Sequence, residues 1–502
     1  MHGIGKGVPD GNGVRQGFPA KFDPDTVVPF GSAHEEGVGQ MGRAVLYGRF
    51  DPDTACSIEQ VRLGMLHVGL IMFDPATPGQ PCPLQDNPVE RYTAGYLGNG
   101  VGYLFAPRTH AHVTHVDVFL RAGPRYEGEA NNGVTHYLEH LLINPAYFRG
   151  AVKKLWGALE TQGATLGAWT GKEFLTLRVV APAEAVEKAL DFARAMLESA
   201  RIRKADVEAE RPVILDELMR RRYSAQQVFL IVEEALFRGG YGQPVLGKEA
   251  TIRELTYKEI KAWAERATAA DSVRVVVSGR VEEAAIAGVE RFGDLGKGEP
   301  LYDEGYVEIA PRFVAIPGDS PRVRLLLAFP GPGMNREDRF AGEVLAYLSG
   351  AGLRSQIFQD LRQRSGLAYE AFGGSVHYEN AGMLFFNVEL ARERLLDGFR
   401  ALIDSVRAIA RLRLSSEDTT RAIEGLVMNL LQQTESAQVS RRLGMNWLQD
   451  NLFFPSREAM RYRRVTPSDV RGIAEKYLKT EAMAMAAVGV GADELAEMME
   501  VM

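Results

Sequence analysis

Apolar residues follow two different periods from about residue 91 onward. They alternate with polar residues in VGYLFA, residues 101–106, and in HVTHVDVFL, residues 112–120, which predicts two strands that end before Gly123-Pro124. A helix is expected from about Gly133. Further helices are predicted over residues 152–163, 183–199, 204–223, 258–267 and 282–291, and strands over 164–170, 174–181 and 273–277. These elements predict an α+β unit that ends near residue 295.

A helix, a strand and a glycine occur in the same order near the end of the chain. LTYKEIKAWAERATAADSVRVVVSG, which starts at Leu255, aligns without gaps with VTPSDVRGIAEKYLKTEAMAMAAVG, which starts at Val465. Identical pairs include Thr256/Thr466, Ala264/Ala474, Glu265/Glu475 and Gly279/Gly489. The repeat predicts an internal duplication, with two homologous α/β-sandwich domains preceded by an irregular N-terminal extension.

The division of the chain follows from where these patterns begin and end. Residues 1–90 are predicted to be the N-terminal extension. Residues 1 to about 32 are rich in Gly, Pro and Asp and are expected to be irregular, whereas Ser57–Phe73 could form one element that packs on the main body. The first domain is placed at 91–295. The segment 296–321 holds four prolines and is predicted to be a linker. The second domain is then 322–502.

The composition excludes several classes of protein. Among 502 residues, 46% are hydrophobic and 25% are charged, as in ordinary globular chains. The formal charge of −7 argues against a nucleic-acid partner, because no excess of basic residues is present to neutralise phosphates. No membrane span is expected, since the apolar run Val61–Phe73 is short and contains Arg62. Only Cys56 and Cys82 occur, which favours a reducing, cytoplasmic location.

Candidate chemistry is concentrated in His136-Tyr137-Leu138-Glu139-His140. Residues four apart on a helix share one face, so both imidazoles can bind one zinc ion, while Glu139 can take a proton from the water that the metal activates. The alternative is a helix with two histidines satisfied by other partners. The helix is expected to take its N-cap oxygen from Thr135, or from Asn131 or Asn132.

A zinc site of this kind needs a third protein ligand and one open position. His377 is the only histidine after His140, so the third ligand is expected to be a carboxylate of the acid-rich helix over 204–223. Glu210 and Glu217 are seven residues apart there and face the same way. One could bind the metal and the other orient the site, or both could be solvated charges.

The combination of these motifs resembles the pitrilysin/insulinase family of zinc peptidases, close to the mitochondrial processing peptidase branch and its bacterial relatives. The resemblance covers residues from about 91 to 490. It rests on HYLEH preceded by AGPRYEGEANNGV and on Glu217, which lies 217 − 140 = 77 residues beyond the second histidine. The resemblance implies that His136, His140 and Glu217 bind zinc, that Glu139 is the general base, and that Glu210 is the accessory acidic residue.

The resemblance also implies functional residues outside the metal motif. The stretch LSGAGLRSQIFQDLRQRSGLAYEAF is similar to the family segment whose arginine and tyrosine reach the active site, which are Arg362 and Tyr369 here. Both could stabilise an oxyanion. The strand around Ala168 could pair with a substrate peptide. Gly167 stands where the family usually has Asn, so one polar contact to substrate is missing.

The function that follows is a zinc-dependent endopeptidase with one Zn²⁺ per chain. Its substrates are expected to be unfolded peptides or presequences enclosed in a chamber that a homodimer, or a heterodimer with a homologous chain, would complete. One alternative is a non-catalytic structural subunit of a heteromeric peptidase-like complex. A purely structural zinc site is a weaker alternative, because such a site normally has four protein ligands.

Overall fold

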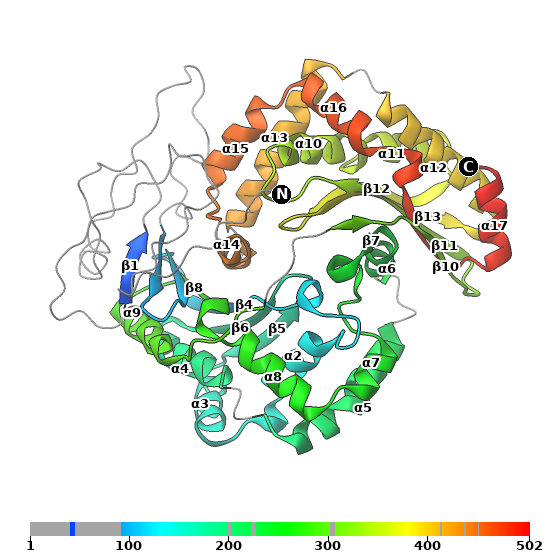
Figure 1. The fold of residues 1–502 in the computed structure, drawn as a ribbon. Coiled ribbons are helices and arrows are strands. Elements are labelled where there is room, and N and C mark those ends of the chain that lie inside the picture. The colour runs from blue at the N-terminus through cyan, green and yellow to red at the C-terminus, as the bar shows by residue number, and fades with distance from the viewer. Residues whose placement is uncertain are drawn as a thin grey trace, which may run out of the picture.

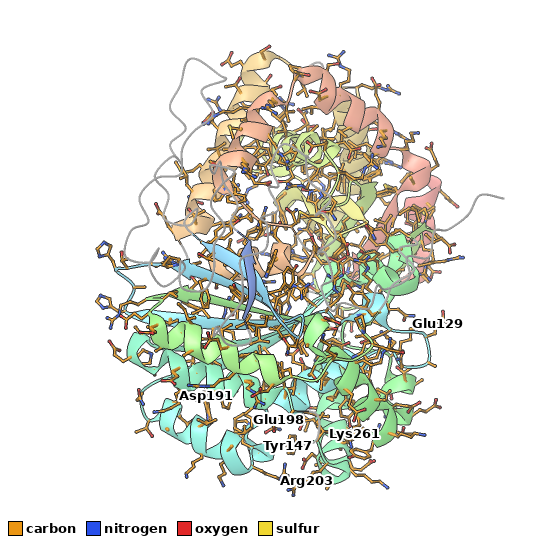
Figure 2. All side chains as sticks on the ribbon, turned by 60° about the vertical axis from the view of Figure 1, so that its left-hand side comes forward. Glu129, Tyr147, Asp191, Glu198, Arg203 and Lys261 are labelled. Carbon is orange, nitrogen blue, oxygen red and sulfur yellow. The ribbon has the colours of Figure 1, made fainter. Side chains whose placement is uncertain are left out.

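The computed structural model describes residues 41–45, 92–198, 202–221, 227–301, 307–411, 414–435, 438–449 and 451–502. These residues form two halves, one above the other in Figure 1 and again in the turned view of Figure 2, where the labelled side chains belong to the lower, first half. The element expected over Ser57–Phe73, and both cysteines, lie outside the described residues. No helix among the described residues is long and apolar enough to cross a membrane.

The first half is built on a seven-stranded sheet with the strand order β1-β2-β3-β8-β4-β6-β5. Its strands are β1 (Met41–Val45), β2 (Thr93–Leu97), β3 (Gly102–Pro107), β4 (Val113–Leu120), β5 (Thr165–Thr170), β6 (Leu175–Pro182) and β8 (Val273–Gly279). β3 and β8 pair in parallel, whereas β4, β5 and β6 form antiparallel pairs. The strand β5 therefore lies at one edge of the sheet.

Helices cover one face of this sheet. They are α2 (Val134–Ile143), α3 (Gly150–Glu160), α4 (Val186–Met196), α8 (Tyr257–Ala267) and α9 (Glu283–Glu290), with α5 (Lys204–Arg221) beside α2 and α7 (Glu249–Glu254) beside α5. Side chains alternate along each strand, so Val116 and Val118 of β4 pack under these helices while Phe119 points to the opposite face. The helices and strands predicted between residues 101 and 291 are present, with ends that differ by a few residues.

The second half repeats this plan with a five-stranded sheet in the order β10-β14-β11-β13-β12. Its strands are β10 (Phe313–Ile316), β11 (Arg322–Gly331), β12 (Ala368–His377), β13 (Gly382–Ala391) and β14 (Ala484–Val488). Its helices are α10 (Asp338–Gly350), α11 (Gln356–Phe358), which continues as a π-helix over Gln359–Arg364, α12 (Leu395–Ala410), α13 (Ser416–Glu435), α15 (Pro455–Arg464), α16 (Pro467–Tyr477) and α17 (Ala492–Glu500). β10 lies inside the segment predicted as a linker and pairs with β14, so the end of that segment belongs to the second sheet.

The internal duplication is visible in local structure. Thr256 begins α8 with a capping box to Glu259, and Thr466 begins α16 with the same arrangement to Asp469. The strand that follows each helix reaches a glycine with positive φ, at 139° for Gly279 and 85° for Gly489. The prediction of two homologous α/β sandwiches is confirmed by these matching elements.

Each half also covers the free face of the other half's sheet with one helix. α6 (Gln227–Leu236) packs on β11 and β14 of the second sheet, and α14 (Gln438–Leu448) packs on β4 and β8 of the first, as Figure 1 shows for both helices. The apolar residues of α6 meet Leu326 and Ala328, while Leu443 and Trp447 of α14 belong to the same core as Phe119. This exchange ties the two halves together.

A buried polar cluster joins the halves a short distance from the end of β5. Arg125 donates through Nη1 to Oε1 of Glu173 and to Oε2 of Glu379, at 2.6 Å in each case. The hydroxyl of Tyr241 donates to Oε1 of Glu173 (2.6 Å), and Nε2 of Gln449 donates to Oε2 (2.9 Å). Burial raises the pKa of Glu173, although the charge of Arg125 acts in the opposite direction. The turn between β5 and β6 is thereby fixed to the second half.

Candidate metal centre

The helix α2 starts differently from the prediction. Its N-cap residue is Gly133, with φ at 94° and no capping side chain. The carboxylate of Glu127 instead accepts hydrogen bonds from the amides of Gly133 (2.7 Å) and Thr135 (2.9 Å). The expectation that Thr135, Asn131 or Asn132 would supply the cap oxygen was therefore wrong. A buried carboxylate from the preceding loop satisfies the first amides, and its negative charge suits the N-terminus of a helix.

The apolar face of α2 fixes the direction of its two histidines. Tyr137, Leu138, Leu141 and Leu142 are buried in the core of the first half. His136 and His140 lie one turn apart on the side that faces α5, with ring centroids 4.7 Å apart and an angle of 83° between the rings. His136 is 5% exposed, whereas His140 is partly exposed. The two rings therefore meet at the border between core and solvent.

α5 brings the third group of the site. Oε2 of Glu217 lies 3.0 Å from Nε2 of His140 and 3.7 Å from Nε2 of His136. The ligand atoms of these three residues lie within 4.8 Å of one another, and no other group in the described parts of the chain has this spacing. The sequence prediction that the acid-rich helix supplies a carboxylate to the two histidines agrees with this geometry.

The donor set fits a zinc ion. Two imidazole nitrogens and one carboxylate oxygen are common zinc ligands, and tetrahedral bonds of about 2.0–2.2 Å place ligand atoms roughly 3.3 Å apart. The distances of 3.0 and 3.7 Å from Glu217 to the histidines lie on either side of that value. An ion could thus be held with small side-chain shifts, and three protein ligands would leave a fourth position for water or substrate.

Glu139 lies next to the metal group and has its own partner. The hydroxyl of Thr170, at the end of β5, donates a hydrogen bond to Oε2 of Glu139. Burial raises the pKa of Glu139, the hydrogen bond from Thr170 and the charge of His140 lower it, and the charge of Glu217 adds to the rise. A carboxylate with a raised pKa is a stronger proton acceptor, which suits a general base near neutral pH.

Glu210 forms a hydrogen bond with Nδ1 of His140, the ring nitrogen that points away from Glu217. Its Oε1 lies 2.8 Å from Nδ1 of His140, so Nε2 is left to face Glu217. Its Oε2 accepts hydrogen bonds from Asn144 (2.9 Å) and Tyr147 (2.5 Å). Burial would raise the pKa of Glu210, but the hydrogen bonds from His140, Tyr147 and Asn144 hold it below its usual value. Of the two carboxylates on α5, Glu210 therefore has the geometry of an orienting group and Glu217 that of a ligand.

The protonation of His140 depends on the same two carboxylates. Burial alone would lower its pKa, but hydrogen bonds to Glu210 and Glu217 raise the pKa of His140 to about 9 in the metal-free protein. A metal ion at Nε2 must therefore displace a proton at neutral pH.

The strand β5 presents an edge beside this site. Its backbone pairs with β6 along one side, with Gly167 opposite Arg178 and Ala168 opposite Leu177. No other strand among the described residues pairs with β5. A Cβ added at Gly167 would meet nothing within 4 Å, so the space that an Asn side chain would fill is open.

Arg362 and Tyr369 lie away from the metal group. Arg362 is in the π-helix after α11, Tyr369 is in β12, and both belong to the upper half of Figure 1, whereas α2 belongs to the lower half. Nη1 of Arg362 donates to the carbonyl oxygen of Tyr369 (2.5 Å), and Arg322 lies over the Tyr369 ring. The structure therefore does not bring these two side chains to the candidate zinc ligands, and their role stays a prediction.

Three site residues were missed in the sequence. Thr170, Asn144 and Tyr147 hold Glu139 and Glu210, yet none belongs to the metal motif. Asn144 and Tyr147 could have been found, because they are polar residues directly after the motif helix. Thr170 comes from a strand 31 residues away from Glu139, and only the packing of α2 on β5 brings it close.

Comparison with known proteins gives a consistent picture. Residues 104–249 match the family described as insulinase (peptidase family M16), and residues 254–426 match the domain described as the peptidase M16 inactive domain. A Mycobacterium bovis protein named an uncharacterized zinc protease is 27% identical over 388 residues, covering 74% of this chain and 87% of its own. A probable mitochondrial-processing peptidase subunit beta from Arabidopsis thaliana is 24% identical over 413 residues, covering 78% and 77%.

Solved structures share the fold. A protease from Helicobacter pylori superposes with a TM-score of 0.69 at 18% identity, covering 80% of this chain and 99% of its own. A structure described as the peptidase M16 inactive domain from Pseudomonas fluorescens gives a TM-score of 0.67 at 18% identity, covering 80% and 98%. The two-half architecture is therefore that of M16-like proteins.

Proposed function

The chain belongs to the insulinase family of peptidases, family M16, and from this premise we propose that it is a zinc-dependent endopeptidase that cleaves unfolded peptides. One observation supports this function above all others. Three side chains with ligand spacing meet beside Glu139, a carboxylate that is held by Thr170 instead of belonging to the ligand group. A site with three protein ligands and an adjacent base suits hydrolysis better than a structural role.

In this proposal His136, His140 and Glu217 hold one zinc ion per chain. The bound ion supplies a Lewis acid that polarises the scissile carbonyl and lowers the pKa of a water molecule to about 7. Glu139 accepts the proton of the attacking water and later donates it to the leaving amine. Glu210 keeps the His140 ring in one orientation through Nδ1.

The edge of β5 is the proposed position of the substrate backbone. A peptide that pairs with the outer edge around Ala168 would extend the sheet and run past Thr170, whose hydroxyl holds Glu139. Main-chain hydrogen bonds of this kind select extended, unfolded segments and give little sequence preference by themselves. Gly167 has no side chain that could contact the substrate, so only its backbone can bind the peptide at this position.

A second chain, identical or homologous, is proposed to complete the chamber around the peptide. The match to the inactive domain covers residues 254–426, from the last elements of the first half into the second half, and among the described residues the metal group belongs to the first half alone. The non-catalytic alternative rests on that inactive-domain match. It differs from the main proposal in one property: such a subunit cleaves nothing without an active partner.

Quenched fluorescent peptides, with products identified by mass spectrometry, test the proposed function. We expect the purified, zinc-loaded chain to cleave unstructured peptides at internal bonds, because β5 is an edge strand with which an extended peptide can pair along its length. A small, stably folded protein should stay intact in the same assay. Removal of terminal residues only, or no cleavage even when a homologous second chain is added, would contradict the proposal. Cleavage that appears only when a homologous chain is added would identify the second chain of the chamber as a homologous partner instead of an identical copy.

Arg362 and Tyr369 are predicted to act when the second half closes over a bound peptide. Tyr369→Phe and Arg362→Ala should each keep zinc and thermal stability, because Arg362 is exposed and Tyr369 is 61% exposed. Each should lower kcat/KM by about 10²-fold or more, the size expected for one oxyanion donor. Arg364→Ala, in the same π-helix with its side chain 68% exposed, is the matched control and should be neutral. Wild-type rates in Tyr369→Phe would remove the second half from the catalytic site.

A further inference from the structure

A tryptophan and an arginine from different halves stack beside the free edge of β5. Cζ of Arg441, on α14, lies 3.2 Å from the centroid of the Trp169 ring, on β5. Trp169 is 42% exposed and Arg441 is partly exposed. The pair therefore forms a surface that a neighbouring peptide can reach.

The positive charge of Arg441 is not neutralised by Asp117, the carboxylate whose charge acts on it. Asp117 on β4 is fully buried, and it accepts from Nε of Arg178 at Oδ1 (2.5 Å) and from Nη2 at Oδ2 (3.1 Å). Both oxygens of Asp117 are thus taken by Arg178, which also donates through Nη2 to the hydroxyl of Ser440 on α14 (3.2 Å). Within the described parts of the chain, no carboxylate lies within ion-pair distance of Arg441. A partly buried cation without an anionic partner gains most from binding an anion.

The geometry of β5 decides which substrate side chains would meet this pair. Thr170, Ala168 and Leu166 face α2, because Thr170 bonds Glu139 and the other two pack in the core under the helices. Trp169 and Gly167 consequently face the opposite side, toward α14. A strand added to the outer edge alternates in the same way, so every second substrate side chain would point to the side of Trp169, with neighbours about 4.5–5.5 Å apart.

Gly167 leaves room on that side. A Cβ at this position would meet no atom within 4 Å, so the space beside Gly167 on this face of the strand is open. A carboxylate on the added strand could approach the guanidinium without displacing a side chain of β5.

We propose that Arg441, stacked on Trp169, is a specificity subsite for an acidic side chain of the substrate peptide. This inference rests on the proposed peptidase function and on pairing of the substrate with β5. Trp169 holds the guanidinium in a fixed plane, and the planar fork is suited to bidentate contact with a carboxylate. Because the charge comes from the second half and the strand from the first, the subsite exists only while α14 stays packed on the first sheet.

A set of peptides that are identical except for Glu, Gln or Lys at one position, moved stepwise along the peptide, tests the subsite. The wild-type chain is expected to show, at one or more alternate positions, a kcat/KM at least about tenfold higher for Glu than for Lys. Added salt should reduce this ratio. In Arg441→Gln the ratio should approach one, and in Arg441→Glu it should invert. Arg400→Glu, on the exposed side of α12, reverses a charge elsewhere and should leave the ratio unchanged.

A second measurement separates this inference from the proposed function. Binding of labelled Glu and Lys peptides to the zinc-loaded Glu139→Gln protein, followed by fluorescence anisotropy, needs no cleavage. Tighter binding of the Glu peptide that disappears in the double variant with Arg441→Gln supports the subsite even if the chain proves inactive. The inference would be overturned if the preference for the Glu peptide over the Lys peptide, in kcat/KM or in affinity, were the same in the wild type and in Arg441→Gln. Arg441→Gln could instead lower the thermal stability of the protein and lower kcat/KM equally for all peptides. That result would show that the pair only holds α14 against the first sheet, and it would also overturn the inference.

Discussion

Zinc-loaded Glu139→Gln protein is expected to retain its metal and to lose about 10³-fold or more of its peptide hydrolysis. Glutamine keeps the shape of the side chain and can still bond the hydroxyl of Thr170, but it cannot accept a proton. General acid–base groups typically contribute about 10²–10⁴-fold to a rate, and Glu139 is proposed to act in both proton transfers. The measurement is steady-state cleavage of a quenched peptide, with zinc determined in the same sample.

The matched control for this variant is Glu160→Gln, which changes an exposed carboxylate at the end of α3 in the same half. It should cleave at the wild-type rate. Activity of Glu139→Gln within a few fold of wild type would exclude Glu139 as the base. Loss of zinc from Glu139→Gln would instead show that the carboxylate takes part in holding the metal.

Removal of any one candidate ligand should have an equally large effect, on the metal itself. His136→Ala, His140→Ala and Glu217→Ala each leave two protein ligands, which is too few for a stable site of this type. Each variant should therefore contain little zinc after dialysis and show no activity. Asp216→Asn, next to Glu217 with its side chain 65% exposed, is the control and should bind zinc normally. Stoichiometric zinc at wild-type affinity in all three ligand variants would refute the assignment.

Two graded effects belong to this prediction. Glu210→Gln should weaken zinc binding by about 10–100-fold without abolishing it, because Glu210 orients His140 and does not face the ligand group.

Zinc affinity should also fall as the pH falls below about 9, since the raised pKa of His140 means that the metal competes with a proton there. Competition with one proton gives about a tenfold loss per pH unit. Affinity that is independent of pH between 6 and 8 would contradict the proposed binding at His140.

The sequence predicted the local parts of this site well because they depend on short spacings. A spacing of four positions from His136 to His140, and of seven from Glu210 to Glu217, decides which side chains share a helix face. Both pairs converge in the structure. The repeat of a helix, a strand and a glycine after Thr256 and Thr466 could also be predicted, because the capping threonine and the final glycine are identical residues at matching positions in the sequence.

Contacts between distant segments could not be predicted in the same way. The apolar face of α6 or α14 shows that each helix is buried, but no period tells which sheet it covers, and each covers the sheet of the other half. The prediction for the N-terminus of α2 was wrong because it considered only polar side chains at or directly before the helix. The oxygen that accepts from the first amides belongs to Glu127, six residues before Gly133 in the preceding loop. Thr170 and Arg441 likewise acquire their roles only when β5 is placed between α2 and α14.

Titration of zinc into the metal-depleted protein, with peptide cleavage followed at each addition, tests the central claim most directly. The proposed site predicts no cleavage without metal and a linear rise that ends at one zinc ion per chain, the number of metal groups in the described residues. Full cleavage by the metal-free protein, or stoichiometric zinc binding that never produces cleavage, would contradict the claim that this chain is a zinc peptidase.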